Sequence, residues 1–312
     1  MTESPSSVKV AALYHFAMVD DPAALRLQVL PLCEKHGLKG TILLASEGMN
    51  GTIAGTPESI DVVIAGLRLL PGFSELDVKY SEASTMPFLR MKVRLKKEIV
   101  SMGVEGVDAA TQQGNYVDPQ QWNDLIADPD TVVIDTRNGY EVAIGSFDGA
   151  INPDTRSFRD FPAWFDEFSE QLRQKESKKP KIAMFCTGGI RCEKATAYVK
   201  AQGFDDVHHL KGGILKYLEH VPESESLWKG DCFLFDQRVA VGHGLRESDY
   251  GQCYACRMPL NAEDRASPDY VPGEACPHCI DQRSDEQRAR YRERQRQVEQ
   301  AAKQGRQHLG TA

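Results

Sequence analysis

One cysteine stands where a buried strand would meet a helix. Residues 182–185 form a short apolar run, Cys186 follows it directly, and a helix is expected from Arg191. Between them, Gly188 and Gly189 let the backbone curl, so that its N–H groups and the helix N-terminus form an anion-binding cradle. A thiolate in this cradle is stabilised, and the positive charge of Arg191 adds to the effect. The spacing therefore predicts a reactive thiol; the alternative is a buried core cysteine before a tight turn.

Three further side chains could support that thiol. Cys192 could resolve an oxidised Cys186, or it could be a small packed residue at a helical position. Asp135 ends the apolar run of residues 131–135, and Arg137 lies two residues further on. This pair could position a substrate, but an ion pair that stiffens the loop is the favoured interpretation.

A second set of cysteines has the spacing of a metal site. Cys253 and Cys256 form one Cys-x-x-Cys pair, and Cys276 and Cys279 form another. Each pair places two sulfurs within reach of one ion, and the intervening length suits a tetrahedral Cys₄ zinc site. Four cysteines leave no open coordination position, so the expected zinc is structural. Disulfides and a degenerate site without metal are the alternatives.

Cations alternate with apolar residues just after residue 89. Arg90, Lys92 and Arg94 would lie on one face of a strand, and that face could follow an RNA backbone. An edge strand protected by its charges is the alternative. The arginine-rich tail after residue 284 is expected to matter less for RNA, because mobile charges lose more entropy on binding.

The elements around these residues predict an α/β protein. Residues 1–100 show the order βαββαβ of a ferredoxin-like domain, with Asn50-Gly51 as the turn of a hairpin and a basic strand over 88–100 as its exit. In residues 114–222 strands alternate with helices, which predicts a parallel sheet covered on both faces. A Cys-rich region with the zinc site then spans 223–284, and a charged flexible or helical tail spans 285–312.

Several segments of the second unit resemble the rhodanese domain. They are the loop Cys186-Thr187-Gly188-Gly189-Ile190-Arg191, the strand end Ile134-Asp135-Thr136-Arg137 and the pair Gly212-Gly213. The resemblance covers about residues 114–222 and implies a rhodanese-like catalytic domain. Many sulfur-transferring members carry Arg where this chain has Thr187, which argues against simple thiosulfate chemistry.

A closer resemblance covers nearly the whole chain. The segments 47–52, 186–194 and 235–244 are similar to those of the bacterial tRNA uridine hydroxylase family, TrhO. The resemblance implies an acylphosphatase-like N-terminal domain, a rhodanese domain with Cys186 as its catalytic cysteine, and a Cys-rich tail. It also implies oxygen-dependent conversion of the wobble uridine (position 34) of tRNA to 5-hydroxyuridine, with O₂ as the oxygen source and the anticodon region as the partner.

The chemistry of uracil is compatible with a thiol catalyst. A thiolate that adds to C6 gives an enolate that is nucleophilic at C5 and could meet O₂; a persulfide or other oxidised sulfur is the competing hypothesis. Neither a dinucleotide fingerprint nor a flavin motif stands out, so no organic cofactor is evident. Two other functions stay open: a sulfurtransferase with a Cys186 persulfide, and an RNA- or protein-binding adaptor with a relict rhodanese loop.

Length and composition set the outer limits. The 312 residues are enough for about two domains. A net charge of −8 excludes a chain that is basic throughout, although local basic patches are compatible with it. Apolar runs are far shorter than the ~20 residues of a membrane span, and the N-terminus lacks the pattern of a signal peptide. The expected location is the cytoplasm, where the cysteines stay reduced.

Overall fold

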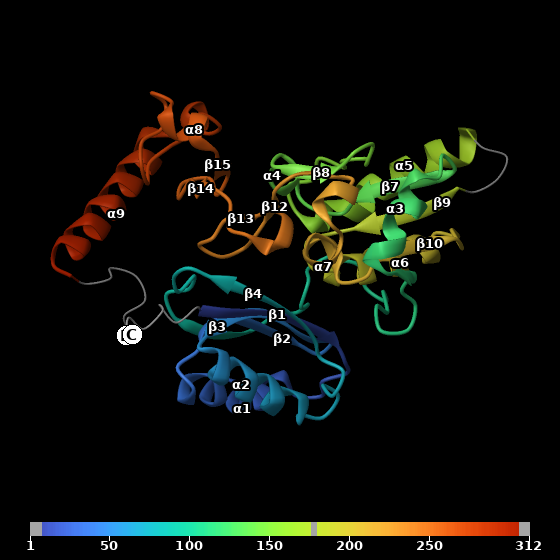
Figure 1. The fold of residues 1–312 in the computed structure, drawn as a ribbon, viewed down its shortest axis with the longest axis horizontal. Coiled ribbons are helices and arrows are strands. Elements are labelled where there is room, and N and C mark those ends of the chain that lie inside the picture. The colour runs from blue at the N-terminus through green and yellow to red at the C-terminus, as the bar shows by residue number, and fades with distance from the viewer. Residues whose placement is uncertain (1–7, 176–179, 306–312) are drawn as a thin grey trace.

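The computed structural model describes residues 8–175 and 180–305, and it shows two α/β units followed by a Cys-rich module and a long helix (Figure 1). No helix in these described ranges is long and apolar enough to cross a membrane. Residues 306–312 of the expected tail lie outside the described residues, as do residues 1–7 of the first expected domain.

The N-terminal unit is a five-stranded sheet with two helices on one face (Figure 1). The strands run in the order β4-β1-β3-β2-β5, antiparallel except that β5 pairs parallel with β2. The ferredoxin-like order predicted from the sequence is confirmed. The elements are β1 (Val8–Phe16), α1 (Pro22–Lys35), β2 (Lys39–Ala45), β3 (Gly48–Gly55), α2 (Pro57–Arg68), β4 (Asp77–Ala83) and β5 (Met91–Leu95).

Local sequence explains where the two helices begin. The Asp21 carboxylate caps α1 by accepting hydrogen bonds from two backbone amides of its first turn, and the Thr56 hydroxyl caps α2 by accepting one from the Ser59 amide. Both helices open with proline, which fits the first turn because its missing N–H has no partner there. Their apolar faces pack on the sheet over a core that includes Val29, Ile42 and Val63.

Two expectations for this unit are wrong. The chain reverses at residues 46–47, because Ala45 pairs with Gly48, and Asn50-Gly51 lies inside β3 instead of forming a turn. Gly51 is needed there for a different reason: a Cβ at this position would lie 2.4 Å from the Thr41 carbonyl oxygen of the neighbouring strand. The exit strand is also shorter than the expected range of 88–100, since pairing with β2 is limited to β5 and its flanking hydrogen bonds.

The second unit has a parallel four-stranded sheet, as predicted. The order is β6-β10-β9-β7. One core, with Phe165 and Val199, fills the space under α5 and α6, and another, with Trp122 and Ile214, fills the space under α3 and α7. The elements are β6 (Asn115–Val117), α3 (Pro119–Ala127), β7 (Thr131–Asp135), α4 (Gly139–Val142), β8 (Gly145–Phe147), α5 (Phe161–Lys175), β9 (Lys181–Phe185), α6 (Ile190–Ala201), β10 (Val207–Leu210) and α7 (Gly213–His220).

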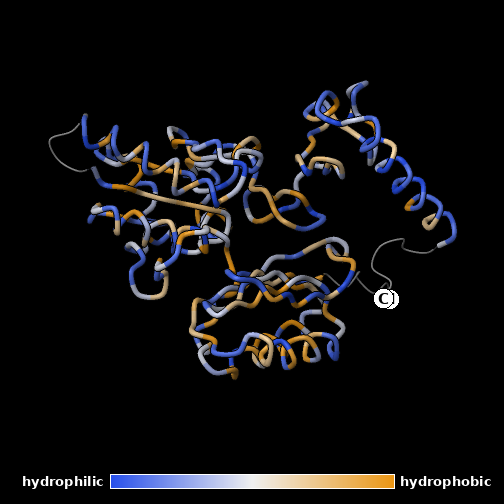
Figure 2. Tube along the Cα trace, turned by 180° about the vertical axis from the view of Figure 1, so that it is seen from behind, coloured by the Kyte–Doolittle hydropathy of each residue, from blue (hydrophilic) through white to orange (hydrophobic). Residues whose placement is uncertain are grey.

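The chain after α7 first adds short strands to the second unit and then forms a separate Cys-rich module and a long helix. Strand β11 (Trp228–Gly230) pairs with β8, and β12 (Cys232–Phe233) pairs with β13 (Ala240–Val241). The Cys-rich module holds β14 (Gly251–Gln252), β15 (Pro259–Leu260) and α8 (Ala262–Ala266). Helix α9 (Asp285–Lys303) is largely hydrophilic and extends away from the body (Figures 1 and 2). Short 3₁₀ turns cover Phe158–Asp160, Glu223–Glu225, His243–Leu245 and Ile280–Gln282.

Candidate active site

Cys186 directly follows β9 and starts the loop that leads to α6, where it is completely buried. The Gly189 amide donates a hydrogen bond to the Cys186 sulfur at 3.1 Å, and this needs a φ of +99° that favours glycine. Helix α7 closes the loop from outside, because the Ile214 amide donates to the Cys186 carbonyl at 3.0 Å. A Cβ on Gly213 would lie 2.5 Å from that same carbonyl oxygen. The predicted cradle is therefore built by close backbone packing.

The Cys186 thiol ionises easily in this environment. Burial raises its pKa, but the Cys192 thiol, the charge of Arg191 and the backbone amides of Cys192 and Gly189 outweigh that effect and lower the pKa to about 6. A thiolate is the nucleophilic form of cysteine, so the group is active near neutral pH. Cys192 lies fully buried, and burial with the neighbouring Cys186 raises its pKa well above the ordinary value.

A carboxylate that the sequence did not reveal holds Arg191. Both guanidinium Nη atoms of Arg191 donate to Glu141 at 2.7 Å, and the Thr187 hydroxyl donates to the same carboxylate at 3.2 Å. Glu141 is completely buried. Burial raises its pKa, but the charge of Arg191 and its hydrogen bonds lower it below the usual range. The ion pair therefore fixes a positive charge beside Cys186.

Asp135 and Arg137 form an ion pair behind the loop. Their closest atoms are 2.6 Å apart, and both side chains are 0% exposed. Arg137 also donates to the Gly145 carbonyl at 2.6 Å, so it ties β7 to β8. Neither residue is among those that line the cleft described below. Their geometry is that of the stiffening ion pair that the sequence favoured.

A cleft of about 530 Å³ separates the cysteine loop from the N-terminal sheet. This volume is typical of pockets for small molecules, and it would accommodate a nucleoside. The loop contributes Cys186, Thr187, Gly188, Ile190 and Arg191. The opposite wall is the sheet face that carries no helix, with side chains such as Thr41, Leu43, Asn50, Thr52, Lys79 and Ser81.

An exposed aromatic ring stands at the cleft beside Arg191. Phe235 is 63% exposed, and the Arg191 guanidinium carbon lies 5.9 Å from its ring centre. The segment that carries it is anchored: Arg238 pairs with Asp236 at 2.6 Å and donates to the Ser81 hydroxyl at 2.7 Å. Sequence reasoning missed this residue, because the exposure of one phenylalanine in an irregular segment has no local signal.

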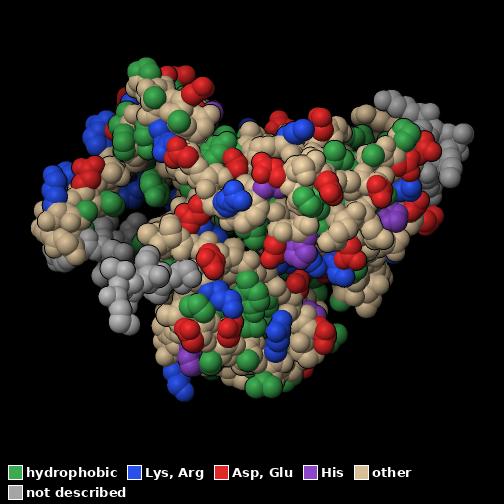
Figure 3. Space-filling view, viewed as in Figure 1, with side chains coloured by type: hydrophobic (Ala, Val, Ile, Leu, Met, Phe, Trp, Pro, Cys, Tyr) green, Lys and Arg blue, Asp and Glu red, His purple; other side chains and the backbone are tan. Residues whose placement is uncertain are grey.

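The predicted basic strand borders the same cleft. In β5, Lys92 pairs with Thr41 and Arg94 pairs with Leu43, and paired residues share a face of the sheet. Lys92 and Arg94 therefore lie on the same face of the sheet as the cleft wall, but they are not among the residues that line the cleft. Burial and the charges of Arg90 and Arg94 lower the pKa of Lys92, which shows that the cations lie close together. On the face seen in Figure 3, positive and negative side chains are otherwise intermixed.

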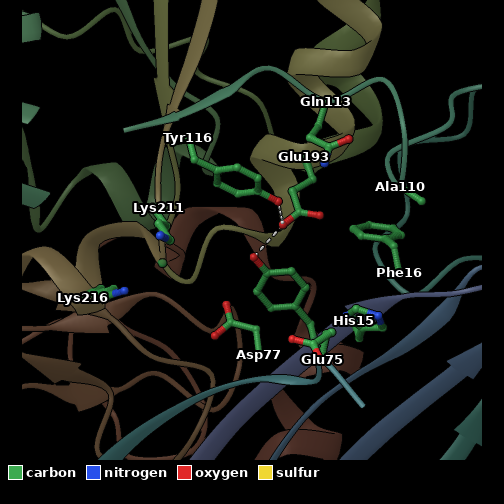
Figure 4. A pocket seen from close by; sticks show the side chains of 12 residues that line it. His15, Phe16, Glu75, Asp77, Ala110, Gln113, Tyr116, Glu193, Lys211 and Lys216 are labelled. Atoms are coloured by element: carbon green, nitrogen blue, oxygen red, sulfur yellow. Dashed lines mark hydrogen bonds between the residues drawn. The ribbon is translucent and has the colours of Figure 1, made fainter. Parts of the chain in front are cut away.

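The two domains are joined on both sides of the loop. Lys194 is buried and pairs with Glu98 at 2.7 Å and with Glu47 at 2.8 Å. On the other side, Glu193 accepts hydrogen bonds from Tyr116 (Figure 4) and from Tyr14 of β1 at 2.9 and 2.7 Å. These groups border a second cavity of about 290 Å³. The orientation of the cleft walls is thus fixed by residues that directly follow Cys192.

Known proteins share this arrangement of domains. Residues 8–99 match the family described as a UPF0176 acylphosphatase-like domain, and residues 118–220 match the rhodanese-like domain. The chain is 57% identical over 312 residues to the "tRNA uridine(34) hydroxylase" of Gluconobacter oxydans, covering 99% of both chains. It is 57% identical over 314 residues to the protein of that name from Mesorhizobium japonicum, covering 100% of both. The chain belongs to this hydroxylase family.

In this member of the hydroxylase family, the four tail cysteines form one cluster. The sulfurs of Cys253, Cys256, Cys276 and Cys279 lie within 4.8 Å of one another and could hold a metal ion. A small core that includes Leu260 and Ala275 surrounds them. His278, which lies between the second pair, instead contacts Asp264 at 3.0 Å. Helix α9 is attached to this module, because Arg288 and Arg292 both donate to the buried Glu274 carboxylate.

We expect alkylation of Cys186 by iodoacetamide to follow a titration with a midpoint near pH 6. Mass spectrometry of the peptide that carries Cys186 measures the rate. In the double variant Glu141→Gln/Arg191→Met the midpoint should rise, because the positive charge is removed without leaving a buried carboxylate unpaired. Cys33, whose pKa burial raises to about 12, is an internal reference that should stay unlabelled. An unchanged midpoint in the double variant would contradict the role given to Arg191.

Proposed function

We propose that this chain hydroxylates uridine 34 of tRNA at C5, with Cys186 as the attacking group and O₂ as the oxygen source. The relatives that share its full length are named tRNA uridine(34) hydroxylases. The observation that carries the mechanism is the position of Cys186, which lines a cleft between two domains with its sulfur held by the Gly189 amide, and the lowered pKa of this thiol agrees with it. A thiolate there can add to C6 of a uracil, and the resulting enolate is nucleophilic at C5, where it meets O₂.

The cleft supplies the contacts that an extruded base needs. A loop base enters an enzyme pocket unstacked, and proteins compensate by stacking it on aromatic rings and by binding the adjoining phosphates. Phe235 offers an exposed ring on the Cys186 side of the cleft. Arg191 and the backbone amides of the loop can hold the negative charge that develops on the uracil oxygen after thiolate attack.

A sulfurtransferase with a Cys186 persulfide is the alternative enzyme. Thr187 bears on this choice, because its hydroxyl is committed to Glu141 and it adds no positive charge to the loop for a thiosulfate anion. The adaptor hypothesis has less support, since a lowered thiol pKa serves chemistry and not binding. A thiosulfate–cyanide assay separates the two enzymes.

Cys186→Ser should lower 5-hydroxyuridine formation by on the order of 10³-fold or more, because a hydroxyl of ordinary pKa is a poor nucleophile. Nucleoside mass spectrometry of tRNA incubated with the protein and O₂ measures the product. The variant should unfold at the wild-type temperature, which shows that the loss is chemical. Product at the wild-type rate from this variant would remove Cys186 from the mechanism.

We propose that the β5 cations bind the tRNA backbone. Charge reversal at Arg90 and Lys92 should raise the tRNA half-saturation concentration and reduce the salt slope by about one per lost phosphate contact, with a smaller effect on the saturated rate. Steady-state kinetics at several salt concentrations measure both quantities. The matched control is Arg26→Glu/Lys35→Glu, which makes the same charge change on exposed positions of α1, behind the sheet.

Truncation of the C-terminal tail tests the alternative, that the tail and not β5 binds the tRNA. Removing residues 297–312 leaves Arg288 and Arg292 in place on Glu274 and should retain most tRNA binding. If this truncation abolishes binding while the Arg90/Lys92 reversal leaves it unchanged, the RNA surface lies within residues 297–312 and not on β5.

We propose that the cysteine cluster holds one structural zinc ion. Four mutually close sulfurs match the tetrahedral thiolate set that zinc prefers, and they leave no site for a catalytic water. Reduced protein should contain about one zinc per chain by metal analysis, and Cys253→Ser or Cys276→Ser should lose it and lower the unfolding temperature. Cys232→Ser, which changes a cysteine outside the cluster, should keep the metal. Wild-type protein that is purified reduced and contains no zinc would refute the site.

A further inference from the structure

Hydroxylation by O₂ leaves one oxygen atom that must be reduced. One atom enters the C5–OH group, and the other becomes water only if two electrons and two protons are supplied. Two neighbouring thiols supply both when they are oxidised to a disulfide. A second cysteine beside Cys186 would therefore complete the electron balance.

Cys192 lies directly behind Cys186. Both residues are 0% exposed, and both contact Gly189, whose amide donates to the Cys186 sulfur at 3.1 Å. The neighbouring Cys192 thiol also contributes to the lowered pKa of Cys186. The Cys192 amide donates to the Gly189 carbonyl at 3.0 Å, so the two cysteines stand at the start and end of one tight loop. The Thr136 hydroxyl, 3.6 Å from the Cys192 sulfur, supports it from the other side. Cys186 lines the cleft, whereas Cys192 is not among the lining residues.

The two thiols differ in their position relative to the cleft and in how readily they ionise, which suits them to act one after the other. Cys186 faces the substrate side and ionises readily, while Cys192 keeps its proton in the core. An oxidant in the cleft therefore reaches Cys186 first, and the oxidised Cys186 sulfur is met from behind by a thiol that still carries its proton.

We propose that Cys192 is the resolving thiol of the reaction and that each turnover leaves the chain with a Cys186–Cys192 disulfide. This inference rests on the proposed function, and the two thiols are the reductant of the second oxygen atom. A thiol from solution, such as dithiothreitol, must then reduce the pair before the next turnover.

The steps balance in atoms and electrons. The Cys186 thiolate forms a bond to C6, and the enolate takes O₂ and a proton at C5 to give a hydroperoxide. Loss of the C5 proton breaks the C6–S bond and releases Cys186, whose thiolate attacks the distal peroxide oxygen. The O–O bond breaks, the hydroxyl group stays on C5, and Cys186 becomes a sulfenic acid. Cys192 then displaces that oxygen as water and forms the disulfide. Uridine, O₂ and two thiols give 5-hydroxyuridine, water and one disulfide.

The test counts product per chain. Reduced, desalted full-length protein is mixed in aerated buffer with excess tRNA transcript that carries an unmodified uridine 34. Without added reductant, wild type should form at most about one 5-hydroxyuridine per chain, and peptide mass spectrometry without reduction should find Cys186 joined to Cys192. Dithiothreitol should restore repeated turnover.

Variants of Cys192 separate a redox role from packing. Cys192→Ser should still form up to one product per chain, but Cys186 should then carry a sulfenic acid that dimedone traps. Cys192→Ala repeats the measurement with a side chain that brings no hydroxyl into the core. Cys33→Ala, which removes a buried thiol from the N-terminal core, should behave as wild type in both readouts.

Two results would overturn the inference while the proposed function stands. One is repeated turnover by wild type in the absence of any reductant, and the other is a free Cys186 thiol after one equivalent of product has formed. Absence of product in every arm, including that with dithiothreitol, overturns the proposed function and this inference with it.

Discussion

The ion pair between Glu141 and Arg191 is the interaction on which the site depends. Its two hydrogen bonds of 2.7 Å hold a guanidinium beside a completely buried sulfur, and the carboxylate is itself completely buried. Breaking a buried pair by removing one partner typically costs about 3–5 kcal/mol, because the remaining charge is left without compensation. The pair therefore does not act as an adjustable surface contact. It sets the charge that the thiolate meets and, through Thr187, the shape of the loop around it.

The first turn of α6 carries that constraint to the rest of the molecule. Arg191 pairs with Glu141, Cys192 contributes to the lowered pKa of Cys186, Glu193 accepts a hydrogen bond from Tyr14, and Lys194 pairs with Glu98. These four consecutive residues thus hold the active-site loop, adjoin the nucleophile and make the two contacts with the N-terminal domain. Because they share one helical turn, a displacement of the N-terminal domain would move the thiol environment as well. The position of the cleft wall and the environment of the nucleophile are consequently coupled.

Sequence reasoning succeeded where structure is set locally and failed where it is set by distant contacts. The cysteine loop was predictable because Gly188, Gly189 and Arg191 shape it within six residues. Asn50 looked like a turn residue, but its side-chain amide donates to the Ile99 carbonyl at 2.8 Å, at the end of the same domain. Glu141 was missed because its partner lies fifty positions away in the chain. The four tail cysteines were found by spacing, since two short loops suffice to bring each pair together.

The proposed RNA contact on the uncovered face of the N-terminal sheet is compatible with a net charge of −8. Helices α1 and α2 occupy one face, and the residues on that side, such as Ile42 and Ile53, are 0% exposed. Their neighbours on the other face, such as Thr41 and Thr52, remain only half-buried and polar, so this face is a wall and not a core. The parallel pairing of β5 then places Lys92 and Arg94 on the same face, next to that wall. Cations are needed only where phosphates lie, and screening limits their reach to about 8–10 Å at physiological salt, so acidic surface elsewhere does not oppose a local basic strip.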